Sequence, residues 1–134
     1  MKRPSCDNCL IRNIVLSDLY KNGVVSQRAF RDNDPDGLSL TETRNEIRGL
    51  EDLEDYITVA SGGLSVRIGV AVMDARDCRS VGLNWRPDPH TDHRFGHLHV
   101  LGPVKDELTT DLRNECARLA NLTEWSKGPG TKPA

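Results

Sequence analysis

The feature that most constrains the fold is a short apolar run at 64–72, Leu-Ser-Val-Arg-Ile-Gly-Val-Ala-Val. Its β-branched residues fall at alternate positions and a Ser-Gly-Gly turn precedes it, which is typical of a β-strand. Similar but shorter patterns predict further extended segments. These lie at 9–15, 24–30, 83–85 and 97–101. Several of them are close enough in sequence to pair antiparallel.

Two longer segments have the periodicity of amphipathic helices. Apolar residues recur every three or four positions over 43–60 and again over 104–122, so each segment would present one apolar face. A shorter helix is predicted near 75–80, with Asp74 as its N-cap and Gly82 just past its C-terminal end. The pattern therefore predicts an α+β fold, with a small mixed or mostly antiparallel sheet packed by two main helices and one short one.

The chain has the length of one domain. With 134 residues it can bury a single core, and we assign 1–125 to one globular α+β domain in which 1–8 form a loose lead-in. The segment 126–134, Ser-Lys-Gly-Pro-Gly-Thr-Lys-Pro-Ala, is rich in Gly, Pro and Lys and is predicted to be a disordered tail.

Composition argues against several classes of function. Eighteen basic and 20 acidic residues are interspersed and give a net charge of −2, and aromatic residues make up only 4%. Neither a phosphate-tracking stripe nor a stacking platform is present, so a nucleic-acid ligand is not expected. No apolar run reaches the roughly 18 residues of a membrane span, and no apolar stretch follows the basic N-terminus. We therefore expect a cytoplasmic protein whose four cysteines are thiols or metal ligands.

The strongest candidate for chemistry is a histidine-rich loop. All four histidines lie within 90–99, and His97 and His99 are two residues apart, so on a strand they would share a face. Such a pair can hold a metal, bind a phosphate or transfer a proton. The alternative is a polar surface loop followed by a strand whose histidines face solvent.

A Cys-x-x-Cys pair, Cys6 and Cys9, suggests a second kind of site. A mixed metal site would combine these two cysteines with histidines of the loop, namely His93, His97 and His99. The simpler interpretation is that both cysteines are free thiols near the terminus. We therefore expect no cofactor, with zinc as the alternative.

The third candidate is Arg12, which is embedded in an apolar strand. A buried arginine needs a partner, so Arg12 either meets an anion or is paired structurally with a carboxylate. Together with the segment Gly37-Leu38-Ser39, it is loosely similar to the nicotinamide-binding cleft of ADP-ribosyltransferases. The resemblance covers about a third of the chain and implies a nucleotide-bearing substrate. The sequence departs from that pattern because the late strand carries histidines where a catalytic glutamate belongs.

These observations support two main hypotheses of function. The first is a small protein-binding or regulatory module, for example a subunit of a larger bacterial-type assembly, because no complete catalytic set is visible. It implies a protein partner and leaves the oligomeric state open. The alternative is an enzyme that acts on a phosphate- or nucleotide-bearing substrate, with His97, His99, Arg12 and Ser39 as catalytic residues. A metal-dependent fold is a third hypothesis.

Overall fold

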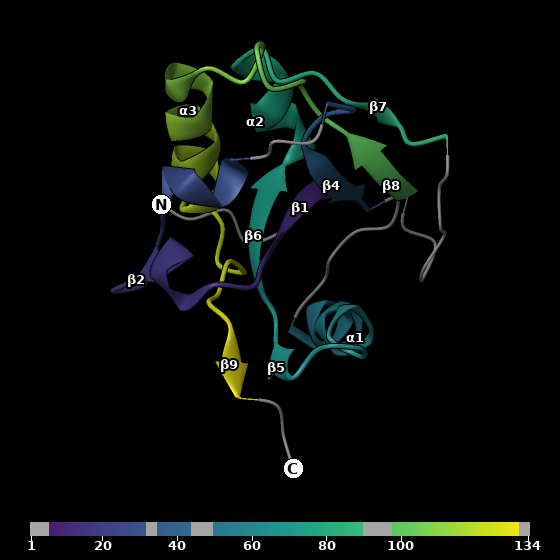
Figure 1. Ribbon diagram of the computed structural model, residues 1–134, viewed down its shortest axis with the longest axis vertical. Helices are drawn as coiled ribbons and strands as arrows, with labels where there is room; N and C mark the ends of the chain where they lie inside the picture. The colour runs from purple at the N-terminus through teal and green to yellow at the C-terminus, as the bar shows by residue number, and fades with distance from the viewer. Residues whose placement is uncertain (1–5, 32–34, 44–49, 90–97, 132–134) are drawn as a thin grey trace.

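The computed structural model describes residues 6–31, 35–43, 50–89 and 98–131, and for 50, 51 and 131 it describes the backbone alone. Its centre is a five-stranded sheet in the order β6-β1-β4-β8-β7, in which every neighbouring pair is antiparallel (Figure 1). The strands are β1 (Cys9–Ile14), β4 (Ser39–Glu42), β6 (Gly69–Asp74), β7 (Arg86–Pro87) and β8 (Leu98–Leu101). The predicted α+β class is confirmed.

Helices cover both faces of this sheet. Helices α2 (Ala75–Ser80) and α3 (Thr110–Ala120) lie on one side in Figure 1, and α1 (Leu50–Ala60) lies on the other. The first face packs a large core with α2, α3 and the 3₁₀ turn η2 (Gln27–Phe30). The second face packs a smaller core under α1. Its buried members are Cys6, Cys9, Ile11, Leu53, Tyr56, Ile57, Ile68, Val70, Val72 and Trp125.

The short helix follows from local signals and matches its predicted bounds. The Asp74 side chain accepts a hydrogen bond from the backbone N–H of Arg76, and Gly82 has the positive φ of a helix-ending glycine. The predicted helix over 104–122 is shorter in the structure, because Thr109 caps α3 through its hydroxyl. A separate turn precedes it, in which the N–H of Leu108 donates to the carbonyl of Val104.

Other predicted bounds differ as well. Residues 50–60 of the predicted helix over 43–60 are helical, but Thr43 directly follows β4, and its hydroxyl accepts from the N–H of Cys9. The predicted strand over 24–30 is only β3 (Val24–Val25), which forms a hairpin with β2 (Tyr20–Lys21), and the chain then enters η2. Ser26 begins η2 by accepting a hydrogen bond from the N–H of Arg28, which ends the extended conformation.

The prediction of a disordered tail from residue 126 is wrong for 126–131. Lys127 exchanges backbone hydrogen bonds with Val70, and β9 (Gly130–Thr131) pairs with β5 (Val66–Arg67). Lys127 also contacts the Glu54 carboxylate. This segment therefore covers the β6 edge of the sheet, which would otherwise leave backbone groups unpaired. Composition missed it because these contacts are made by backbone groups.

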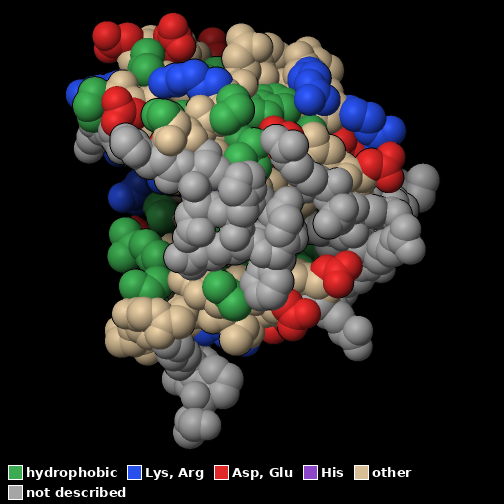
Figure 2. Space-filling view, turned by 90° about the vertical axis from the view of Figure 1, so that its right-hand side faces the viewer, with side chains coloured by type: hydrophobic (Ala, Val, Ile, Leu, Met, Phe, Trp, Pro, Cys, Tyr) green, Lys and Arg blue, Asp and Glu red, His purple; other side chains and the backbone are tan. Residues whose placement is uncertain are grey.

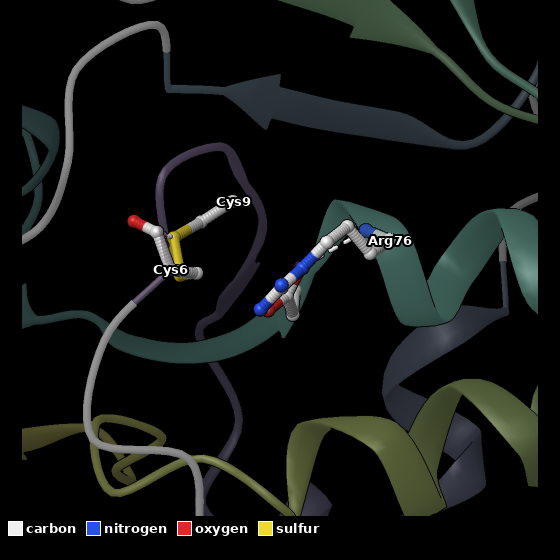
Figure 3. A network of polar contacts seen from close by, with 4 residues as sticks. Cys6, Cys9 and Arg76 are labelled. Carbon is white, nitrogen blue, oxygen red and sulfur yellow. Dashed lines mark hydrogen bonds and ion pairs between the residues drawn. A yellow bond between two sulfur atoms is a disulfide. The ribbon is translucent and has the colours of Figure 1, made fainter.

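The lead-in is also held from Cys6 onward. Cys6 and Cys9 form a disulfide, with Cα atoms 5.8 Å apart, which is within the usual range for such a bond. The prediction of free thiols at this pair is therefore wrong, because the turn between them brings the two sulfur atoms together. The N–H of Ala75 donates to the carbonyl of Asn8. Figure 3 shows the disulfide near Arg76, whose pKa is raised by its hydrogen bond and ion pair with Asp74.

The described surface agrees with the balanced composition. Figure 2 shows Lys and Arg side chains next to Asp and Glu along the upper part of one face, with no field of a single sign. Among the described residues, no helix is both long and apolar enough to cross a membrane.

The two remaining cysteines should resist modification in the native protein. Cys78 and Cys116 are fully buried, and burial raises the pKa of Cys116 to about 12 and that of Cys78 well above its usual range. At pH 8 almost no thiolate would form, so native protein kept without reductant should show no reactive thiol toward iodoacetamide. Unfolding should release two thiols, and unfolding with a reductant should release four. Four thiols released without reductant would contradict the disulfide.

Gly69 should be needed for the C-terminal segment to pack on β6. A Cβ at this position would collide with the backbone carbonyl of Lys127 and with the backbone of residues 128 and 129. We expect Gly69→Ala to lower the free energy of unfolding by about 1–3 kcal/mol in urea titrations. Gly63→Ala is the matched control, because a Cβ there meets nothing within 4 Å. Equal effects of the two substitutions would contradict this packing.

Candidate active site

Two side chains on neighbouring strands and one just after a third strand form a hydrogen-bonded array. The Oγ of Ser39 lies 2.7 Å from Nε2 of His99, and Nδ1 of the same ring lies 2.7 Å from Oδ2 of Asp88. The His99 side chain is 33% exposed and that of Asp88 only 14%, so the imidazole is reachable while the carboxylate is shielded. A hydroxyl, an imidazole and a carboxylate in this order have the arrangement of an activated nucleophile with its base.

Strand register places these three residues together. On β4 and β8, Thr41 pairs with His99, so Ser39 is the diagonal neighbour of His99 on the same face. On β7 and β8, Pro87 pairs with Val100, and the N–H of Asp88 then donates to the carbonyl of His99. Asp88 is therefore the next cross-strand partner of His99. The array follows from two antiparallel ladders rather than from closeness in sequence.

When the His99 imidazole is neutral, its two contacts determine which ring nitrogen carries the proton. An ionised carboxylate only accepts hydrogen bonds, so Nδ1–H donates to Asp88 and the Nε2 lone pair faces Ser39. The hydroxyl of Ser39 then donates to Nε2. In this tautomer His99 can take up the Ser39 proton, and Asp88 stabilises the resulting imidazolium.

Arg12 supports the array from the opposite face of the sheet. Its guanidinium donates to the backbone carbonyls of Ser39 and Ala29, both at 2.9 Å, and of Arg31 at 3.2 Å. The backbones of β1 and β4 pair at Ile11 and Thr41, and the guanidinium lies where the next pair of backbone hydrogen bonds between the two strands would otherwise form. Arg12 therefore fixes the backbone of Ser39. These carbonyl oxygens are partners that Arg12 was predicted to need, and the predicted carboxylate or anion partner stays a prediction.

A close backbone approach fixes the start of β4. Gly37 has φ +123°, and a Cβ there would collide with the carbonyl oxygen of Gly102. Beside it, Leu38 and the 102–103 segment exchange hydrogen bonds, from Leu38 to Pro103 at 3.1 Å and from Gly102 to Leu38 at 2.7 Å. These bonds set the register that places Ser39 near His99.

The structure brings together only part of the predicted site. Ser39 and His99 are in direct contact, and Arg12 reaches Ser39 through its backbone. His93 and His97 lie outside the described residues, so their predicted roles stay predictions. Asp88 was missed because the extended segment was predicted at 83–85, whereas the strand that pairs with β8 is β7 at 86–87, directly before Asp88.

The predicted metal set is not assembled among the residues that the structure describes. Within them, no group of three potential ligands is close enough to hold an ion. The sulfur atoms of Cys6 and Cys9 are bonded to each other, so in this state neither is a thiolate ligand. Both nitrogens of His99 face Ser39 and Asp88.

Trp85 has a structural role in the described part of the chain. Its indole N–H donates to the Glu42 carboxylate, and the guanidinium of Arg79 stacks over its ring at 4.8 Å. These contacts fix the segment that leads into β7.

Comparison with protein-family models, curated proteins and solved structures found no significant match to this chain. These comparisons therefore add nothing to the resemblance to ADP-ribosyltransferases, and the case for function depends on the geometry of the site.

Arg12 should be required for stability in a way that lysine cannot replace. Its planar guanidinium serves three carbonyls, whereas an ammonium group has neither the width nor the fixed geometry to reach them all. We expect Arg12→Lys to lower the free energy of unfolding by about 2–4 kcal/mol, measured by urea denaturation. Arg28→Lys is the control, since Arg28 is exposed and makes only a 3.7 Å ion pair. A change at Arg12 as small as at Arg28 would contradict the supporting role.

Proposed function

We propose that the chain is an enzyme of acyl transfer or ester hydrolysis that uses Ser39 as its nucleophile. The observation that carries this proposal is the Ser39–His99–Asp88 array, with both hydrogen bonds at 2.7 Å. The hypothesis of a protein-binding module was based on the lack of a complete catalytic set in the sequence. Asp88 supplies the missing member, so the site favours an enzyme, and the module hypothesis stays untested.

The proposed reaction begins with proton transfer to His99. As the Oγ of Ser39 forms a bond to the carbonyl carbon of an ester, its proton moves to Nε2, and Asp88 balances the charge on the ring. The tetrahedral intermediate expels the alkoxide, which takes the proton from Nε2 and leaves as an alcohol. The products of this half-reaction are the acylated Ser39 and the alcohol.

The second half-reaction releases the acyl group by the same steps. A water molecule gives its proton to Nε2 and attacks the acyl carbon, and the Ser39 oxygen departs and recovers that proton. If an alcohol or amine replaces the water, the acyl group is transferred to it. The sheet supports both steps because Ser39 and His99 stand on adjacent strands and the backbone of Asp88, directly after β7, is hydrogen-bonded to that of His99.

The acyl-transfer proposal differs from the enzyme hypothesis based on the sequence in the roles that it gives to Arg12 and Asp88. That hypothesis assumed an anionic substrate held by Arg12, but the guanidinium is occupied by three carbonyls on the other face of the sheet. No anion-binding role for Arg12 is therefore proposed. Ser39 and His99 keep their proposed catalytic roles, and Asp88 is added as the residue that orients His99.

The proposal is tested with a fluorophosphonate probe and with para-nitrophenyl acetate. We expect the probe to label Ser39, identified by peptide mass spectrometry, and the protein to hydrolyse the ester. Ser39→Ala and His99→Ala should each lower kcat/KM by about 1000-fold or more, and Asp88→Asn by about 100-fold or more.

Ser65→Ala is the matched control, because Ser65 is exposed in a turn away from these strands. Thermal unfolding of each variant verifies that the fold is kept. Labelling or hydrolysis that persists in Ser39→Ala, or that falls equally in Ser65→Ala, would show that the array is not catalytic.

A further inference from the structure

A second polar group stands on the same face of the sheet as the array. The Tyr56 hydroxyl, reaching down from α1, donates to Oδ1 of Asn13 at 2.8 Å and lies 3.1 Å from Oγ1 of Thr41. Thr41 pairs with His99 on β8 and with Ile11 on β1. Continuing the β1–β4 register by two residues places Asn13 opposite Ser39. The group therefore borders Ser39 on the side away from Asp88.

The directions of these hydrogen bonds leave one hydrogen-bond donor and one acceptor of this polar group available for a ligand. Tyr56 has a single hydroxyl proton, which it gives to Asn13, so Thr41 must donate its own proton to Tyr56. This leaves the amide N–H groups of Asn13 Nδ2 as a hydrogen-bond donor and the Oγ1 lone pairs of Thr41 as an acceptor. Neither atom has another partner among the residues that the structure describes. Tyr56 itself is only 6% exposed, so α1 holds the group in place.

We infer that Asn13 and Thr41 form a subsite for a secondary amide in the acyl part of the substrate. This inference rests on the proposed function, since Ser39 defines where the acyl carbon lies. An amide has one C=O acceptor and one N–H donor, which match the Nδ2 donor of Asn13 and the Oγ1 acceptor of Thr41. The substrate class is therefore an N-acylated amino-acid or peptidyl ester.

The charges near the subsite support a neutral acyl group. Asn13, Thr41 and Tyr56 carry no formal charge, and the carboxylate of the array, Asp88, is hydrogen-bonded to His99. A carboxylate or ammonium in the acyl part would find no opposite charge among these three residues and would lose water on binding. A simple alkyl chain would instead leave the donor and the acceptor unpaired, which costs affinity.

Two para-nitrophenyl esters of equal chain length separate these cases. One is the ester of N-acetylglycine, which carries an amide, and the other is the ester of pentanoic acid, which does not. We expect the wild-type protein to hydrolyse the amide ester with a kcat/KM about tenfold higher or more, after correction for their rates without protein. Asn13→Ala and Thr41→Val should each lower this preference about fivefold, because the amide ester loses a hydrogen bond and the pentanoate ester does not.

Thr58→Val is the matched control, because Thr58 is exposed on α1 outside the subsite and should leave the preference intact. Hydrolysis that depends on Ser39 but shows no preference for the amide would overturn the subsite and leave the proposed function standing. Loss of activity on both esters in Asn13→Ala and Thr41→Val, with unchanged thermal unfolding, would also overturn it.

A binding experiment keeps the inference testable even if neither ester is hydrolysed. N-acetylglycine N-methylamide is titrated into the Ser39→Ala protein and followed by NMR. Saturable shifts of the Asn13 side-chain amide and of Thr41, absent in Asn13→Ala, would support the amide subsite even if the catalytic proposal fails. If neither ester is hydrolysed, the absence of such shifts would overturn it.

Discussion

The pairing of β1 at the centre of the sheet is the interaction on which the rest of the structure depends. Along its whole length β1 pairs with β6, but it pairs with β4 only at Leu10 and Ile11. Beyond that point the guanidinium of Arg12 joins the two strands by donating to the carbonyl of Ser39. A charged side chain thus replaces a backbone rung, and its cost of burial is offset by three hydrogen bonds to carbonyl oxygens.

This arrangement explains why one half of a sheet face can hold polar, partly exposed side chains. On the face covered by α1, the β1 and β6 half is apolar apart from Asn13, with Ile11, Val70 and Val72 buried beneath the helix. The β4 and β8 half of the same face carries Ser39, Thr41 and His99, which are only partly buried. An antiparallel sheet tolerates such a division because its exposed side chains can be solvated while the opposite face remains in the core.

The sequence predicted those elements that local signals define. Helix α2 is bounded by an N-capping aspartate and a glycine with positive φ, both of which act within one turn of the chain. His99 was found because it lies on a predicted strand, and Ser39 was named through the resemblance carried by Gly37-Leu38-Ser39, whereas strand β4 was not among the segments predicted from the residue pattern. What the sequence did not predict is their contact, since it depends on the order of strands β4, β8 and β7.

The features that were missed share a physical cause. Asp88 meets His99 only through the register of a hairpin, the 126–131 segment is held mostly by backbone bonds to β6 and β5, and the Cys6–Cys9 bond depends on a tight turn. None of these leaves a periodic or compositional pattern, because each involves one or two residues or groups common to every residue. The same reasoning favours the array as a site. Register alone brings Ser39, His99 and Asp88 into line, yet each ring nitrogen meets the partner that its chemistry requires. A sheet held together only by packing has no need for a partly exposed imidazole between a hydroxyl and a shielded carboxylate.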